Sequence, residues 1–336
     1  QYHKDSLLAI DIMLPDTSYF VSLASSDYVD YENNDFHYYY SSPNRPLAIY
    51  KANAINNTSS KVWQKIVHNF NEDDYVVERT FNVVRDGTMV PATLVYKADK
   101  SLNRPILFYG YGSYGINIEA RFRETILPLI NKGFIFVYLN IRGGAEMGKE
   151  WYEQGRMLNK MNSFYDFNDS VEAILKKGYG DKNNVFAQGG SAGGLLMGAI
   201  VNLNPELYKG IISGVPFVDV LTTMSDESIP LTTFEYDEWG NPNNYEEYMY
   251  MKKYSPYDNI DYLNYPSMLI TSSLFDSQVQ YFEPAKYASK LREYSTSSNP
   301  ILFKINLIGG HGGKSGRING FEETAMEHNF LLNLID

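Results

Sequence analysis

The 336-residue chain contains no cysteine, and this absence excludes disulfide bridges and zinc sites built on thiolates. It also lacks an apolar run of the roughly 18–20 residues that cross a bilayer, so we expect no membrane association. A chain without disulfides is compatible with a reducing compartment, and we expect a cytoplasmic location.

Cations are scarce as well, with 29 lysines and arginines against 40 aspartates and glutamates and a formal net charge of −11. This balance argues against a nucleic-acid partner, because phosphate binding requires clustered cations. Apolar residues make up 44% and charged residues 21% of the chain, which excludes a disordered protein. The chain starts at Gln1 rather than methionine, and we expect it to begin inside a larger protein.

Residues 1–75 carry short β-prone stretches separated by turn-forming clusters. The stretches lie at 19–23, 36–40 and 47–50. Their spacing predicts an antiparallel sheet. Because about seventy residues are too few for a closed all-β domain, we expect one or two propeller blades or part of a sandwich.

Residues 76–336 show a different pattern, in which apolar runs alternate with helical stretches. A strong hairpin signal at Asp86-Gly87 comes first. The apolar runs that follow lie at 105–109, 134–139, 185–187, 210–212, 267–271 and 301–305. The helical stretches lie at 162–177, 192–202, 281–294 and 321–334. This alternation predicts a doubly wound, mostly parallel α/β sheet with an antiparallel hairpin at one edge.

The strongest local signal is the sequence Gly-Gly-Ser-Ala-Gly-Gly at 189–194, which places Ser191 between an expected strand and an expected helix. A Gly-x-Ser-x-Gly turn in this context is typical of a nucleophile elbow, where small residues allow a sharp turn and expose the serine. The amide of Ala192 would then face a developing oxyanion. The alternative is a glycine-rich turn with a capping serine.

A serine nucleophile needs a base, and only His311 and His328 follow Ser191 in the chain. His328 falls within an expected amphipathic helix, whereas His311 lies in a glycine-rich loop after the last apolar run, so we predict His311. Asp276 follows the expected strand 267–271 and would orient the imidazole. Taken alone, Asp276 reads equally well as a helix-capping residue.

These motifs, with others along the chain, resemble the prolyl oligopeptidase family of serine peptidases, most closely its oligopeptidase B branch. The matching segments are 109–115, 140–144, 189–194, 215–220, 226–233, 238–242, 254–259, 276–279, 283–286 and 311–317. The resemblance implies an α/β-hydrolase domain over 76–336, no cofactor and no metal. It also implies cleavage of short peptides after arginine or lysine through an acyl-enzyme.

Residue by residue, the resemblance places the catalytic triad at Ser191, Asp276 and His311, in agreement with the motifs themselves. It makes the Tyr111 hydroxyl a second oxyanion donor beside the Ala192 amide. It also places two substrate-binding acids at Glu235 and Asp237, which would share one face if their segment were extended. The remaining substrate-binding positions that it implies are Tyr114, Phe217, Val279 and Glu119.

The sequence departs from the family at three positions within or beside this set. Phe234 replaces a glycine, Asp237 is one methylene shorter than the usual glutamate, and Arg121 replaces a second acid near Glu119. Because the Arg121 cation should weaken binding of a second basic residue, we expect little advantage for substrates with paired basic residues.

Family members also carry a large N-terminal β-propeller, of which residues 1–75 resemble only the end. The missing portion could be a separate chain and therefore a partner.

Two alternatives for the function stay open. One is an esterase or another α/β-hydrolase, although no His-Gly-Gly-Gly motif precedes the elbow. The other is a catalytically silent scaffold with the same fold.

Overall fold

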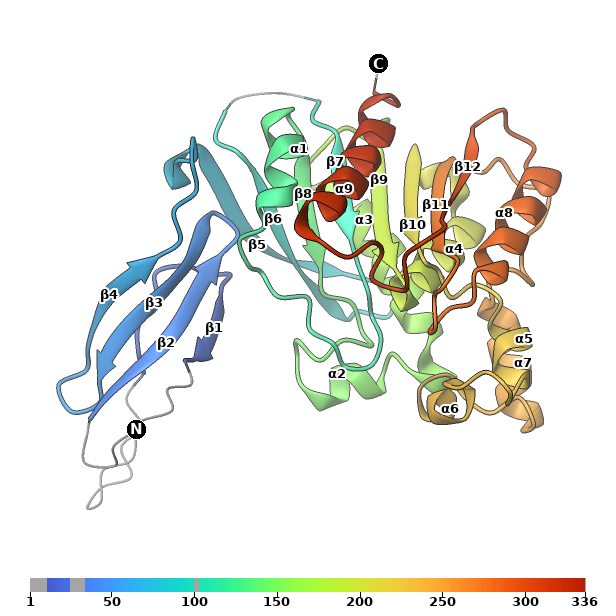
Figure 1. Ribbon diagram of the computed structural model, residues 1–336, viewed down its shortest axis with the longest axis horizontal. Helices are drawn as coiled ribbons and strands as arrows, with labels where there is room; N and C mark the ends of the chain where they lie inside the picture. The colour runs from blue at the N-terminus through green and yellow to red at the C-terminus, as the bar shows by residue number, and fades with distance from the viewer. Residues whose placement is uncertain (1–10, 25–33, 100–102, 336) are drawn as a thin grey trace.

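The structure of the chain is a computed structural model, and it describes residues 11–24, 34–99 and 103–335. Within these ranges the chain forms a four-stranded sheet near its N-terminus and a larger eight-stranded sheet flanked by helices (Figure 1). The smaller sheet ends at Gln64 and the larger one begins at Tyr75. The division into domains at residue 75 remains a prediction.

The smaller sheet is antiparallel, and its strands follow one another in chain order. They are β1 (Phe20–Leu23), β2 (Asp35–Ser42), β3 (Arg45–Asn53) and β4 (Thr58–Gln64). Tyr38, Tyr40 and Ala52 form a small buried core. The first three strands confirm the predicted stretches. The fourth was not predicted, because it is mostly polar and exposed and has no clear apolar alternation.

Several contacts connect the smaller sheet and its flanking residues with the rest of the chain. The Ser18 and Thr93 hydroxyls are 3.0 Å apart, and the Phe122 amide donates to the Ser41 hydroxyl at 3.0 Å. The Arg121 guanidinium lies 3.6 Å from the centroid of the Phe20 ring. The segment that contains Arg121 and Phe122 therefore packs against the N-terminal strands.

The larger sheet has the strand order β12-β11-β10-β9-β7-β8-β6-β5. Its strands are β5 (Tyr75–Val83), β6 (Met89–Lys97), β7 (Ile106–Tyr109), β8 (Ile135–Leu139), β9 (Val185–Gly190), β10 (Gly210–Gly214), β11 (Ser267–Ser273) and β12 (Ile301–Asn306). The strands from β8 to β12 pair in parallel, whereas β5 and β6 form an antiparallel hairpin at one edge. The structure confirms the predicted mostly parallel α/β class.

Helices cover both faces of this sheet, because its central strands are apolar on both sides. One face packs against α1 (Leu127–Asn131) and α9 (Arg317–Leu332), and the other against α3 (Met161–Lys176), α4 (Ala192–Leu203) and α8 (Phe282–Tyr294). The remaining helices lie toward the lower end of the sheet in the view of Figure 1. They are α2 (Lys149–Glu153), α5 (Val220–Ser225), α6 (Tyr236–Trp239) and α7 (Tyr245–Tyr254). Among the described residues, no helix has the length and apolar character of a membrane span.

Candidate active site

Ser191 occupies the sharp turn between β9 and α4. Its backbone is left-handed, with φ 58° and ψ −119°, a conformation that costs energy for a residue with a side chain. The Ser191 amide donates to the Gly214 carbonyl at 2.8 Å, and its carbonyl accepts from the Gly194 amide at 2.8 Å. These bonds to the neighbouring strand and to the helix hold the strained turn in place.

The glycines of the turn are required by close backbone contacts. A Cβ atom at Gly189 would lie 2.3 Å from the Gly193 carbonyl oxygen, and one at Gly193 would lie 2.9 Å from the Gly110 carbonyl oxygen. As the first residue of α4, Ala192 has an amide with no acceptor inside the helix. That N–H is available to an anion forming beside Ser191.

Asp276 and His311 lie in the loops after β11 and β12 and are joined by hydrogen bonds. The His311 Nδ1 lies 2.8 Å from Asp276 Oδ2 and 3.0 Å from Oδ1. Burial favours the neutral acid, but hydrogen bonds from His311 and from the Val279 and Gln278 amides outweigh it and lower the pKa of Asp276. Because an ionised carboxylate only accepts, Nδ1 carries the proton and Nε2 is left free to act as a base.

The loop that carries His311 is held by the last residue of β12. The Asn306 side-chain carbonyl accepts from the Ile308 and Gly309 amides, each at 3.1 Å. The Phe275 amide donates to the Gly309 carbonyl at 3.2 Å and ties this loop to the one that carries Asp276. The two loops therefore present their side chains as one unit.

In the described part of the chain, no hydrogen bond joins the Ser191 hydroxyl to His311. Ser191 lines a pocket together with Ala192, whereas His311 lines a neighbouring cavity between β12 and α9. The structure thus joins Asp276 and His311 by hydrogen bonds, and Ser191 lies in the pocket lined by Gln278 and Val279, whose amides donate to Asp276. Catalytic hydrogen bonds are often long in the absence of substrate and shorten when it binds.

Tyr111 lies half-buried in the loop after β7, with its hydroxyl at the Ser191 side chain. Burial, with the nearby Tyr109 and Glu235, raises the pKa of Tyr111 to about 12, and the Ser191 hydroxyl offsets part of this effect. The phenol therefore stays neutral near pH 7 and can donate a hydrogen bond.

Replacing Tyr111 with phenylalanine is expected to lower kcat for a peptide amide by roughly a hundredfold or more, because one oxyanion donor is lost. Steady-state kinetics measure this effect. Tyr109→Phe is the matched control, because Tyr109 packs with the α1 and α9 cluster on the opposite face of the sheet. Equal activity of the two variants would contradict a donor role for Tyr111.

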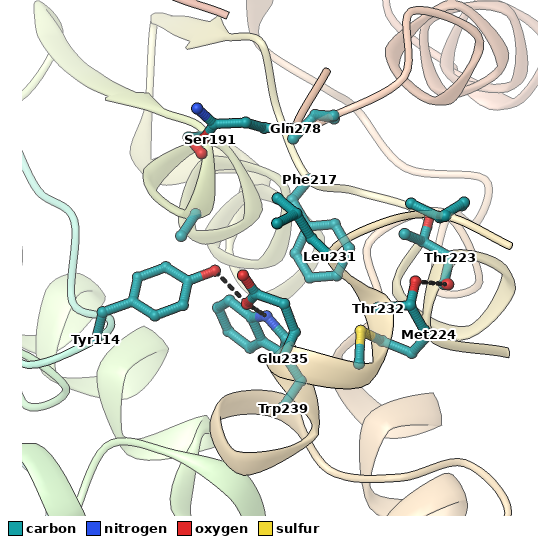
Figure 2. A pocket seen from close by; sticks show the side chains of 13 residues that line it. Tyr114, Ser191, Phe217, Thr223, Met224, Leu231, Thr232, Glu235, Trp239 and Gln278 are labelled. Atoms are coloured by element: carbon teal, nitrogen blue, oxygen red, sulfur yellow. Dashed lines mark hydrogen bonds between the residues drawn. The ribbon is translucent and has the colours of Figure 1, made fainter. Parts of the chain in front are cut away.

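A pocket opens beside Ser191, and four of the predicted substrate-binding side chains line it: Tyr114, Phe217, Glu235 and Val279. Figure 2 shows Glu235 at the side of this pocket, between Tyr114 and Trp239. The Glu235 Oε2 accepts from the Tyr114 hydroxyl at 2.6 Å and from the Trp239 indole N–H at 2.8 Å. Because these donors fix Oε2, the other carboxylate oxygen of Glu235 is available to a ligand.

The predicted pairing of Glu235 with Asp237 on one face was wrong. Residues Thr232–Glu235 form a 3₁₀-helix that continues into α6, so residues two apart do not share a face. Asp237 is exposed and does not line the pocket, and its backbone carbonyl accepts a hydrogen bond from Arg156. The acid that turns inward is Glu238, which is 4% exposed.

Glu119 also lies outside the pocket beside Ser191, in an ion pair with Arg121. Arg121, which stands where the family has a second acid, thus neutralises the charge of Glu119. The Phe20 ring holds the Arg121 guanidinium in place. Phe234, which stands where the family has glycine, is 82% exposed and does not narrow the pocket.

Sequence reasoning missed Glu238 and Trp239, which follow Glu235 by three and four residues. That spacing would have identified them if the segment had been assigned as helical rather than extended. It also missed Lys160, which is buried near them and described below. Among the described residues, no group of three or more histidine, aspartate or glutamate side chains is arranged to hold a metal ion.

Residues 120–336 match the prolyl oligopeptidase family. Among curated proteins, dipeptidyl aminopeptidase BI of Pseudoxanthomonas mexicana is 46% identical over 299 residues, covering 88% of this chain and 41% of that protein. Protease 2 of Moraxella lacunata is 47% identical over 266 residues, covering 79% of this chain and 39% of that protein. The chain thus spans about two fifths of the length of these relatives.

Solved structures that are similar over nearly the whole chain include two oligopeptidases B. Oligopeptidase B from Leishmania major has a TM-score of 0.91 at 39% identity and covers 96% of this chain and 45% of that one. Oligopeptidase B from Trypanosoma brucei with covalently bound antipain has a TM-score of 0.90 at 40% identity and covers 96% of this chain and 46% of that one.

Proposed function

Because the chain belongs to the prolyl oligopeptidase family, we propose that it acts as a serine peptidase that hydrolyses short peptides after arginine or lysine. The observation that carries the proposal is the Glu235 carboxylate in the same pocket as Ser191. A carboxylate at this position pairs with a guanidinium or an ammonium group, and planar pairing favours arginine. Phe217 and Val279 supply apolar surface for the aliphatic part of either side chain.

In the first half of the reaction, the Ser191 hydroxyl attacks the scissile carbonyl and His311 Nε2 takes its proton. Asp276 keeps the ring oriented and stabilises the imidazolium that forms. The Ala192 amide and the Tyr111 hydroxyl donate to the oxyanion. Because Ser191 and His311 share no hydrogen bond without substrate, this transfer requires the two side chains to approach each other.

In the second half, the leaving amine takes the proton from His311 and departs, which leaves an ester between Ser191 and the acyl part of the peptide. Water then attacks this ester, with His311 again acting as the base. Each step is complete with groups of this chain and water, so the mechanism requires neither a cofactor nor a metal.

The smaller sheet supports a proposal about the whole protein. Its four antiparallel strands have the size of one propeller blade, and the relatives are more than twice as long as the chain. The remaining propeller portion, as part of the same protein or as a separate chain, is the expected partner.

The location is expected to be cytoplasmic, because a chain without cysteine has no need of an oxidising compartment.

The test is a comparison of kcat/KM for fluorogenic amides that end in arginine, lysine or phenylalanine, together with labelling by a phosphonate directed at serine. The relative named dipeptidyl aminopeptidase makes it useful to include each amide with a free and with a blocked N-terminus. We expect arginine to exceed lysine and both to exceed phenylalanine. Equal values for arginine and phenylalanine would refute the basic specificity, and an acetate ester cleaved in preference to any amide would favour an esterase.

A further inference from the structure

Lys160 is 1% exposed, although it carries an amine that is normally charged. It lies at the start of α3, and its Nζ donates to the Gly112 carbonyl at 2.5 Å and to the Ser113 hydroxyl at 2.8 Å. Its Nζ also lies 5.1 Å from the centroid of the Trp239 ring, which forms a wall of the pocket beside Ser191. This buried amine therefore contacts both the loop after β7 and the specificity pocket.

Glu238 also holds this loop by a hydrogen bond. One of its oxygens accepts from the Tyr114 amide at 2.9 Å, and the other accepts from the Tyr152 hydroxyl at 2.6 Å. Glu238 is buried and attracts the Lys160 charge. Lys160 and Glu238 are thus two buried groups of opposite charge, and each holds part of the segment 112–114 by hydrogen bonds of its own.

The segment 112–114 connects two functional side chains. Tyr111, whose hydroxyl lies at Ser191, comes directly before it, and Tyr114, which holds Glu235, is its last residue. We propose that Lys160 and Glu238 are positioning residues that hold the oxyanion donor and the specificity pocket in register, and that this requires Lys160 to be charged. The inference rests on the proposed peptidase function and deepens it.

The surroundings of the pair make Lys160 sensitive to pH. Burial lowers the pKa of Lys160 to about 8, and Glu238 opposes this effect in part. Arg156, another cation that interacts with Glu238, is ion-paired with Glu153 at 2.8 Å. Three tyrosines complete the surroundings, and burial raises the pKa of each, so they stay neutral up to pH 10: Tyr152, Tyr250 and Tyr254.

Deprotonation of Lys160 is expected to change activity and stability in opposite directions. A neutral amine donates more weakly to the Gly112 carbonyl and no longer offsets the Glu238 charge, so the loop loosens and kcat falls. The unfolded chain, in contrast, binds the Lys160 proton up to the ordinary pKa of 10.5, whereas the folded chain releases it near pH 8. The contribution of this group to stability therefore rises between these values, which separates loss of activity from unfolding.

The experiment measures kcat and KM of the full 336-residue chain for a blocked arginine amide from pH 6.5 to 9.5, with thermal unfolding at each pH. We expect wild-type kcat to fall above about pH 8 without a matching fall in Tm. Glu238→Gln keeps an acceptor for the Tyr114 amide but removes the charge that opposes deprotonation. It should therefore move the fall in kcat to lower pH by about half a unit or more.

Lys160→Met alone leaves the Glu238 charge buried and could fail to fold, so a double variant is tested as well. Lys160→Met with Glu238→Gln removes both buried charges and should fold, lower kcat at pH 7.5 by about tenfold or more, and abolish the alkaline fall. The matched control is Lys176→Met with Glu172→Gln, an exposed pair on the same helix, which should behave as wild type.

Two results would overturn the inference: wild-type kcat in the double variant, or an alkaline fall that Glu238→Gln leaves unmoved. Failure of the proposed function has a different signature, because wild-type protein would then neither react with the phosphonate nor cleave the amide. In that case the positioning role is refuted along with the function.

Discussion

Replacing Ser191 with alanine is expected to lower kcat for an arginine amide by at least about 10⁴-fold, because the acyl-enzyme can no longer form. His311→Ala should lose a comparable factor, because nothing else in the triad takes the serine proton. Steady-state kinetics with single-turnover controls, at matched protein concentration, measure both effects.

The chain offers a matched control for the histidine. His328 is the other histidine that follows Ser191, and it lies on α9 in a groove shared with α1. His328→Ala should therefore keep wild-type turnover. Near-normal kcat in Ser191→Ala, or an equal loss in the two histidine variants, would refute the assignment of the nucleophile or of the base.

Replacing Glu235 with glutamine should remove about 2–5 kcal/mol of the preference for arginine over phenylalanine, a loss of roughly thirty- to several-thousand-fold in the ratio of kcat/KM values. Glu235 is only half-buried, so the lower end of this range is expected. The neutral amide can still accept from Tyr114 and Trp239, and the change therefore isolates the charge that the substrate meets.

Asp237→Asn is the control for this prediction, because the two acids are two residues apart in the chain but only Glu235 lines the pocket. The structure predicts an unchanged preference for arginine in Asp237→Asn. If Asp237→Asn lost as much preference as Glu235→Gln, the placement of Asp237 outside the pocket would be wrong.

Much of this fold follows from local sequence. The apolar runs that became β7 to β12 are bounded by turns and alternate with helices, so each element is specified within its own residues. The nucleophile elbow can also be predicted from local sequence, because its strand, glycines, serine and helix are contiguous in the chain. The order of Ser191, Asp276 and His311 then needs only the parallel sheet to bring the ends of their strands to one edge.

The errors in the site have a common physical cause. The segment 232–239 contains β-prone residues, but Trp239 is 1% exposed and Gly240 adopts φ 108°, a conformation that ends a helix. Its helical form thus depends on burying the indole against Tyr114 and Phe217, which are distant in sequence. Lys160 was missed for a related reason, because the groups that accept hydrogen bonds from its amine, Gly112 and Ser113, lie far away in the chain.

The left-handed backbone at Ser191 also bears on how this protein could change over time. Glycine adopts that conformation without strain, so Ser191→Gly is expected to unfold at a higher temperature than Ser191→Ala, although neither variant would turn over substrate. Calorimetry would measure the difference, and a higher Tm for the alanine variant would contradict it. At this position selection for catalysis therefore opposes selection for stability. A descendant relieved of catalysis would gain stability by acquiring glycine, so the residue at this turn indicates whether a relative is still an enzyme.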